Sequence, residues 1–445
     1  MFFTSLANPD EIGSHSYLFE LGGTRVILDA GIHPKKAGYT TLPAFDLIEQ
    51  DSVDGIIISH AHLDHLGSLP VLFRNQRHAA VVMTEPTAEL GKALLHNSVN
   101  VMKAQKAELG VIEYPFFSHR ELDEMYKFWL TRRPGQQFRI ENEHDTASES
   151  VVCEMFFAGH VLGAVGVQMK CRDRTIFYTG DVHFEDQTLS RGADFPESGI
   201  DTLIIETTRG DHARDPDYTR EAERNRMGEA AAAALNRGGS VLIPVFALGK
   251  TQEVVLMLHE LMQAGILPGD TPIHIGGLST KMTHLVDKLV GRWPRGHEEI
   301  ELLADLPNLR LLEKGSVELN CQPGRIYCYS SGMMTEHTVS HRFAPKILSD
   351  ERNALLFVGY ADPDSPAGRI QSGNSEFPVR CPVERFDFSG HAPRDQLLDY
   401  IRRVNPKRVI LVHGDAPARA WFADQLADSE MEVMIPETGK KINLD

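Results

Sequence analysis

Short apolar runs recur in the first half of the chain and again near its end, and each gives way to a polar residue. Runs such as TRVIL (24–28) and IFY (176–178) have the near-continuous apolar character of buried strands. Functional sites in α/β folds gather where such strands end. Six strand ends that carry only Asp, Glu or His therefore predict one convergent site. The six residues are Asp29, His60, His160, Asp181, Glu206 and His413.

Between Glu206 and about residue 380 the pattern changes to an alternation of strands and helices. The segment 219–239, TREAERNRMGEAAAAALNRGG, predicts a helix that ends at Gly238 and Gly239. Further strand-to-helix pairs follow it, an alternation that builds a mostly parallel sheet covered by helices. Because the run VILVHG near residue 410 returns to the first pattern, we expect a second α/β domain inserted into the first.

The composition fits a globular protein of two compact units, because 445 residues exceed one ordinary core. No apolar run approaches the roughly 20 residues that span a bilayer, so we expect no membrane partner. The N-terminal residues show no secretory signal pattern and are interpreted as mature structure.

Five scattered cysteines without a C-x-x-C pair indicate a reducing compartment, and we expect a cytoplasmic protein. A net charge of −17 argues against a protein that coats nucleic acid by charge alone.

The densest group of metal-binding side chains lies in IIISHAHLDHLGSLP, residues 56–70. His60 and His62 are two positions apart and point the same way in an extended segment, and Asp64 and His65 follow on a turn. Imidazoles and carboxylates without thiolates suit zinc, with manganese or iron as alternatives. Seven candidate ligands exceed one tetrahedral ion but suit two ions that share a carboxylate and a bridging hydroxide. They are His60, His62, Asp64, His65, His160, Asp181 and His413.

Other histidines stand alone in the sequence. A lone histidine is usually a polar residue near the surface, and six are interpreted in this way. They are His15, His33, His78, His183, His212 and His297.

The motifs together resemble those of a known family. SHAHLDH is similar to the H-x-H-x-D-H signature of the metallo-β-lactamase fold, and LDAG, AGHVLGA and YTGD match its other motifs in order. LIIETTRGD, FDFSGHAPRDQL and ILVHGD resemble the added motifs of the β-CASP branch, which cleaves nucleic acids. The resemblance covers nearly the whole chain and is strongest to the nuclease subunit of the pre-mRNA 3′-end cleavage machinery and its prokaryotic relatives.

The resemblance implies an α/β fold, with a metallo-β-lactamase αββα sandwich and an inserted α/β β-CASP domain. The metallo-β-lactamase domain would comprise residues 1–207 and 379–445, and the β-CASP domain residues 208–378.

The resemblance also implies a role for each site residue. His60, His62 and His160 would hold one zinc ion, Asp64, His65 and His413 the other, and Asp181 would bridge them. Asp29 would orient a ligand histidine. His391 would be the general acid, held by Glu206, and Asp64 is counted with these catalytic residues. Candidate donors to substrate phosphates are Ser330, Ser331, Gly332 and Ser389.

The expected function is a two-zinc ribonuclease, with manganese as an alternative metal. A bridging hydroxide would attack single-stranded RNA internally, and exonuclease activity stays open. One alternative is a two-metal hydrolase of a small ester or phosphodiester, and another is a non-catalytic scaffold subunit of an RNA-processing complex. DNA as substrate and a homodimer also stay open. Three stretches depart from the family pattern where substrate would be bound, and they bear on substrate identity. They are Arg209, Glu336–Thr338 and GYADPDSPAGR.

Overall fold

The chain divides into two compact units. The computed structural model describes residues 1–8, 11–145, 147–296, 302–312 and 320–445. The first unit comprises Met1–Asp186, Gly192–Arg214 and His391–Asp445, and the second comprises Gln187–Arg191 and Asp215–Gly390. The division thus assigns residues 208–214 to the first unit and residues 379–390 to the second. The domain boundaries expected after residues 207 and 378 stay a prediction.

Two seven-stranded sheets form the frame of the first unit. In spatial order, one sheet contains β20 (Lys441–Asn443), β1 (Phe2–Ser5), β2 (Tyr17–Leu21), β3 (Thr24–Leu28), β4 (Gly55–Ile57), β5 (Ala80–Met83) and β6 (Trp129–Thr131). The other contains β19 (Glu432–Met434), β18 (Arg408–Val412), β11 (Thr202–Glu206), β10 (Arg174–Tyr178), β9 (Val165–Cys171), β8 (Val151–Phe157) and β7 (Phe138–Ile140).

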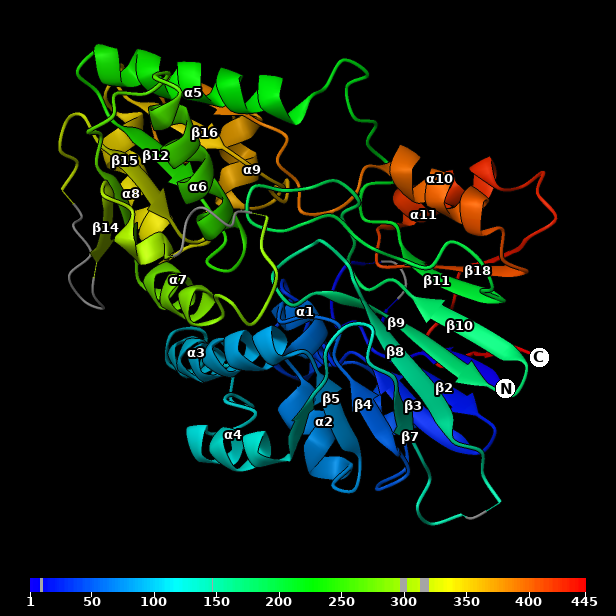
Figure 1. Ribbon diagram of the computed structural model, residues 1–445. Helices are drawn as coiled ribbons and strands as arrows, with labels where there is room; N and C mark the ends of the chain where they lie inside the picture. The colour runs from blue at the N-terminus through cyan, green and yellow to red at the C-terminus, as the bar shows by residue number, and fades with distance from the viewer. Residues whose placement is uncertain (9–10, 146, 297–301, 313–319) are drawn as a thin grey trace. The chain divides into compact units, whose positions relative to one another are not determined.

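The two sheets and the helices that cover them form four layers, which are joined by three apolar cores. Buried side chains of both sheets form one core, in which Phe3 and Phe19 pack with Met155 and Met169. A second core joins the first sheet to the helices α2 (Leu69–Asn75), α3 (Glu85–Leu109) and α4 (His119–Met125). A third joins the other sheet to α10 (Arg394–Val404) and α11 (Ala416–Gln425) (Figure 1). The expected αββα sandwich is confirmed.

The second unit has one six-stranded sheet in which every strand pair is parallel. Its strands are β14 (Leu309–Leu312), β13 (Ile273–Gly276), β15 (Ile326–Tyr329), β12 (Val241–Pro244), β16 (Ala354–Phe357) and β17 (Val383–Arg385). Its helices are α5 (Arg220–Asn236), α6 (Lys250–Gln263), α7 (Leu278–Lys288), α8 (Val339–Leu348) and α9 (Pro366–Gln371). The predicted alternation of strands and helices is confirmed.

Helix α5 illustrates how neighbouring residues determine where a helix begins and ends. The Thr219 side chain accepts a hydrogen bond from the backbone N–H of Ala222 and so caps the first turn. The helix ends at Asn236, and Gly238 follows with φ of 72°, a left-handed conformation that glycine adopts without strain.

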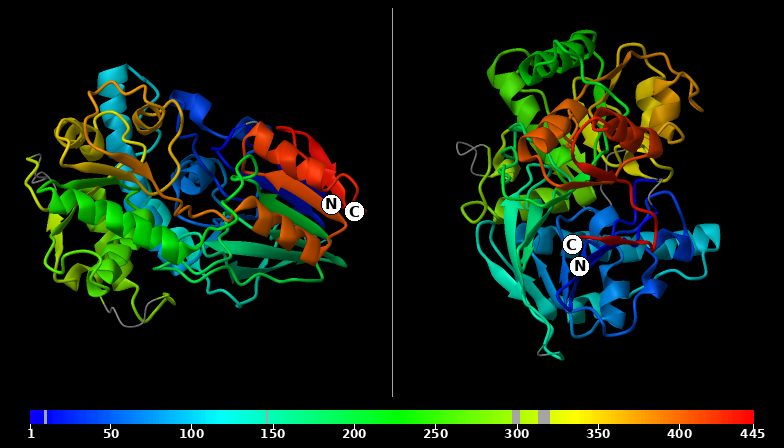
Figure 2. Two further views of the ribbon diagram at one scale, coloured as in Figure 1. Left: turned by 90° about the horizontal axis from the view of Figure 1, so that it is seen from above. Right: turned by 90° about the vertical axis from the view of Figure 1, so that its right-hand side faces the viewer.

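The two termini lie side by side in both views of Figure 2. The N-terminal ammonium group is 2.6 Å from the Asp445 carboxylate, and β20 pairs with β1 in an antiparallel arrangement. The first unit therefore contains both ends of the chain. No helix among the described residues is long and apolar enough to cross a membrane.

Candidate metal centre

The polar residues predicted at strand ends lie at or just after strand ends, and all of them belong to the first unit. Asp29 directly follows β3, and His413 directly follows β18. His60, His160 and Asp181 each come three residues after a strand, β4, β8 and β10 respectively, and Glu206 is the last residue of β11. Strands from both sheets thus supply the centre.

The loop after β4 presents four candidate ligands within six residues. It runs extended to His62, which is the N-cap of the short helix α1 (Leu63–Leu66), and this turn carries Asp64 and His65. The backbone of Gly31 packs so closely on the turn that a Cβ there would lie 1.5 Å from the carbonyl oxygen of Asp64. Backbone hydrogen bonds from Ala30 to His65 (2.7 Å) and from Ile32 to Leu63 (2.8 Å) hold the turn in place.

One group of residues, the first ligand cluster, consists of His60, His62, His160 and Asp181. The Nδ1 atom of His62 is 3.2 Å from His60 Nε2 and 3.1 Å from His160 Nε2. Ligand atoms about 2.05 Å from a tetrahedral ion are roughly 3.3 Å apart, so these nitrogens have the spacing of a shared ion. Burial, reinforced by His65, holds the pKa of His60 well below its usual range, which favours the neutral imidazole that binds metal.

The second ligand cluster consists of Asp64, His65, His413 and the same Asp181. Asp181 Oδ1 is 3.3 Å from His65 Nε2 and 3.2 Å from His413 Nε2, and Asp64 Oδ2 is 3.6 Å from His413 Nε2. The other oxygen of Asp181, Oδ2, is 3.5 Å from His60 Nε2 and 3.6 Å from His160 Nε2. Asp181 therefore presents one carboxylate oxygen to each cluster.

Unpartnered buried atoms test whether these residues fit a metal ion. Among the described residues, His65 Nε2, His413 Nε2 and Asp181 Oδ1 are buried and make no hydrogen bond, although Asp181 Oδ1 lies within 3.3 Å of both nitrogens. A buried polar atom without a partner costs free energy. Cations coordinated by these atoms would remove that cost, so the donor set fits divalent metal.

Asp29 orients one member of the second ligand cluster, His65. Its carboxylate accepts hydrogen bonds from the Ser59 N–H (2.7 Å) and hydroxyl (2.8 Å), and from the Tyr178 hydroxyl (2.7 Å). It also lies 2.7 Å from His65 Nδ1, which directs His65 Nε2 towards the cluster. Thr208 has the corresponding position for His413, with its hydroxyl 2.8 Å from His413 Nδ1. Our sequence interpretation did not include Thr208, although it stands two residues after Glu206.

His391 lies beside both ligand clusters. Its ring centroid is 4.5 Å from that of His160 and 5.7 Å from that of His413. Its Nδ1 is 3.1 and 3.0 Å from the two oxygens of Glu206, which is 1% exposed and also accepts a hydrogen bond from the Val182 N–H (2.6 Å). Burial alone would lower the pKa of His391, but the Glu206 carboxylate, by charge and hydrogen bonding, raises it to about 9.

The residues expected to contact substrate phosphates belong to the second unit. Ser330, Ser331 and Gly332 follow β15, and the hydroxyl of Ser331 accepts a hydrogen bond from the Thr335 N–H (3.0 Å). Ser389 precedes the return of the chain to the first unit. Their role in phosphate binding stays a prediction.

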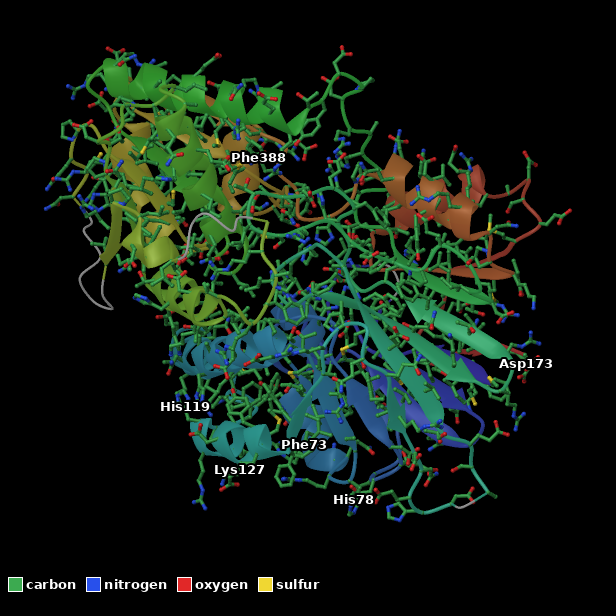
Figure 3. The ribbon with its side chains drawn as sticks, viewed as in Figure 1. Phe73, His78, His119, Lys127, Asp173 and Phe388 are labelled. Atoms are coloured by element: carbon green, nitrogen blue, oxygen red, sulfur yellow. The ribbon has the colours of Figure 1, made fainter. Side chains whose placement is uncertain are left out.

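The interpretation of lone histidines as surface residues is wrong at three positions. His15, His33 and His183 are 2, 3 and 5% exposed. Each has polar partners from the folded chain that offset the cost of burial, such as Glu11 at 2.8 Å from His33 Nε2. His212 and His78 are exposed as expected, and Figure 3 shows His78 at the edge of the first unit. His297 lies outside the described residues.

Three family models match the chain in order. The model of the metallo-beta-lactamase superfamily matches residues 9–232, and the Beta-Casp domain model matches residues 251–370. The model described as the Zn-dependent metallo-hydrolase RNA specificity domain matches residues 376–436.

Curated relatives match nearly the whole chain. It is 29% identical to the probable RNase MJ4 of Methanocaldococcus jannaschii, over 98% of each chain. It is 28% identical to the transcription termination factor FttA of Methanothermobacter thermautotrophicus, over 99% of this chain and 71% of that one. It is also 28% identical to the cleavage and polyadenylation specificity factor subunit 3 of Dictyostelium discoideum, over 99% of this chain but only 57% of the relative.

A solved structure shares the fold. The crystal structure of a protein of unknown function from Enterococcus faecalis V583 matches 99% of each chain, with a TM-score of 0.59 and 13% sequence identity. The superfamily model covers half of the chain, and the Beta-Casp model follows it. The chain therefore belongs to the metallo-β-lactamase superfamily, in the branch that carries an inserted Beta-Casp domain.

Proposed function

We propose that this chain is a two-zinc endoribonuclease that hydrolyses phosphodiester bonds of single-stranded RNA, with manganese as the alternative metal. The observation that carries the proposal is the Asp181 carboxylate, which presents Oδ2 to the first ligand cluster and Oδ1 to the second. Bound as a pair, divalent cations supply Lewis acidity and a water activated at neutral pH.

The chain's own residues supply the proton. Glu206 faces Nδ1 of His391, and in this proposal the Nε2–H of the imidazolium donates its proton to the leaving 3′-oxygen. The charge and hydrogen bond of Glu206 raise the pKa of His391, which favours the protonated ring near neutral pH. Asp29 and Thr208 hold the His65 and His413 rings by their Nδ1 atoms, so both Nε2 atoms stay directed at the second cluster.

RNA is the proposed substrate because of the relatives and one family model. The Methanocaldococcus relative is named a probable RNase, and the model matched at residues 376–436 is named for RNA specificity. That matched segment contains both His391 and His413. The scaffold alternative is disfavoured because a non-catalytic subunit has no need for seven ligands and a general acid in one place.

The test joins metal content to cleavage in the full chain. Zinc would be counted in the purified protein, which would then be incubated with labelled single-stranded RNA, circular RNA and matching DNA. The variants are His391→Ala and, as control, His78→Ala at an exposed histidine.

We expect about two zinc ions per chain, with cutting of circular RNA that is lost in His391→Ala and kept in His78→Ala. Cutting of linear but not circular RNA would indicate an exonuclease instead of an endonuclease. Two zinc ions with hydrolysis of a small aryl phosphodiester alone would favour the small-substrate alternative. Metal without any hydrolysis would favour the scaffold.

A further inference from the structure

His15 is buried against the second ligand cluster although it lies far from its members in the sequence. Its ring centroid is 4.0 Å from that of His413 and 5.0 Å from that of His65, with the planes inclined by 32° and 34°. Its backbone N–H donates a hydrogen bond to the Asp64 carbonyl oxygen at 3.0 Å. His15 therefore contacts three members of this cluster.

The hydrogen bonds of His15 occupy both of its ring nitrogens. Nε2 accepts a hydrogen bond from the Gly13 N–H at 2.9 Å, and Nδ1 lies 3.2 Å from the Tyr17 hydroxyl. Since Nε2 accepts, Nδ1 carries the proton of the neutral ring and donates to Tyr17. No lone pair is left for a cation, even though one ring nitrogen lies within 4.8 Å of a ligand atom from each of Asp64, His65 and His413.

We infer that His15 is a positioning residue, which fixes the ring planes of His413 and His65 for a metal ion without binding the ion itself. The inference rests on the two-metal centre proposed above. Hydrogen bonds at Nδ1 fix one point of each ligand ring, at Thr208 for His413 and at Asp29 for His65. The His15 ring packs against both ligand rings and prevents each of them from rotating about its hydrogen-bonded atom.

A hollow beside His15 determines what removal of the His15 ring would do to His413. His15 and His413 line the same small hollow, together with Tyr17 and Arg419. Truncation to alanine would extend this hollow along the ring of His413, which would free the ring and admit water. A phenylalanine would fill the same space with another flat ring but would offer no nitrogen.

The experiment compares His15→Ala, His15→Leu and His15→Phe with the wild-type full chain. Each protein would be stripped of metal and titrated with Co²⁺, with calorimetry and visible absorption as readouts. Thermal unfolding of the metal-free proteins would measure any general loss of stability. His274→Ala is the matched control, because His274 is also buried (4% exposed) and packs on a ring, that of Tyr327 at 5.2 Å, in the second unit.

We expect two Co²⁺ sites in the wild type, and one of them weakened about 10- to 100-fold with an altered visible spectrum in His15→Ala. His15→Leu repeats the test if the alanine variant does not fold. His15→Phe should bind both ions within about threefold of the wild type, and His274→Ala should bind as the wild type does.

Two results would overturn the inference. Unchanged affinities at both sites in His15→Ala and His15→Leu would show that the ring does not position the ligands. A loss in His15→Phe as large as in His15→Ala would show that the imidazole nitrogens act directly on the ion. Fewer than two sites in the wild type would instead contradict the proposed two-metal centre.

Discussion

The Nδ1 atom of His391 lies 3.0 Å from Oε2 of Glu206, a residue 185 positions earlier in the chain. The carboxylate is buried and is held by the Val182 N–H as well, so its position does not depend on His391. A fixed carboxylate behind an imidazole sets both the orientation of the ring and its tendency to stay protonated.

The first prediction concerns the proton donor. We expect His391→Ala to retain both metal ions and to lose about 10²- to 10⁴-fold in the rate of RNA cleavage, because one general acid typically contributes that much. Single-turnover cleavage and metal analysis of the same preparation would measure the two quantities. A fully active variant would disprove the assignment of His391 as general acid.

The second prediction concerns Glu206 and pH. His391 acts as an acid only while protonated, so the rate should fall as the pH rises through its pKa, which is about 9 without bound cations and lower beside them. In Glu206→Gln the charge that raises this pKa is gone while burial remains, so the alkaline limb of the pH–rate profile should move to lower pH. An unmoved limb would show that another group sets it.

The third prediction concerns the shared carboxylate. Replacing Asp181 by Ala removes an oxygen from each ligand cluster, and we expect the bound metal to fall from about two ions per chain to one or none. Elemental analysis after dialysis would give the number. Retention of both ions by the variant would contradict a bridging role for Asp181.

The fourth prediction concerns Asp29, which accepts hydrogen bonds from Ser59 and Tyr178 and faces His65 Nδ1. In Asp29→Asn the amide has a similar shape but no charge, so His65 loses the charged acceptor that directs its Nε2. We expect about 10- to 100-fold weaker binding of one metal ion, measured by competition with a chelator. Equal weakening of both ions would indicate a general disturbance of the loop instead.

The fifth prediction concerns Lys250 in the second unit, whose ammonium group donates a hydrogen bond to the Phe388 carbonyl oxygen. Burial lowers the pKa of Lys250 to about 8. The unfolded chain therefore holds this proton to higher pH than the folded chain, and the free energy of unfolding should rise between about pH 8 and 10.5. Because other groups titrate in that range, the reference is Lys250→Met.

Relative to Lys250→Met, the wild type should gain on the order of 1–2 kcal/mol in stability across this pH window, since the side chain keeps some contact with solvent. Urea unfolding of both full-length proteins at pH 7.5 and pH 10 would measure the difference. Parallel pH dependence in the two proteins would contradict the prediction.

Much of this architecture follows from local patterns in the sequence. The apolar runs that end at Asp29, His60 and Asp181 are strands, and the segment 219–239 contains α5, because strand burial and helix capping depend on neighbouring residues. The grouping of the metal ligands was expected because strand ends meet at one edge of a sheet and because the motifs resemble a known family.

The site residues that the sequence did not predict depend on contacts between segments that are distant in the chain. Nothing around His15 distinguishes it from a surface histidine, because its burial arises where the segment before β2 meets the turn at Asp64. Thr208 was missed for a similar reason, since its partner His413 lies 205 positions away. Local periodicity carries no information about such pairs.

The position of His413 directly after β18 has a consequence for synthesis. This strand pairs with β11, yet most of the second unit, Asp215–Gly390, lies between the two in the sequence. Domains generally begin to fold from the N-terminus during translation. A nascent chain can thus assemble the first ligand cluster once Asp181 has left the ribosome, but the second cluster lacks His413 until β18 and the residue after it emerge. The proposed hydrolytic activity would therefore begin only after His413 has emerged, and a chain that stops before His413 would have one complete ligand cluster instead of two.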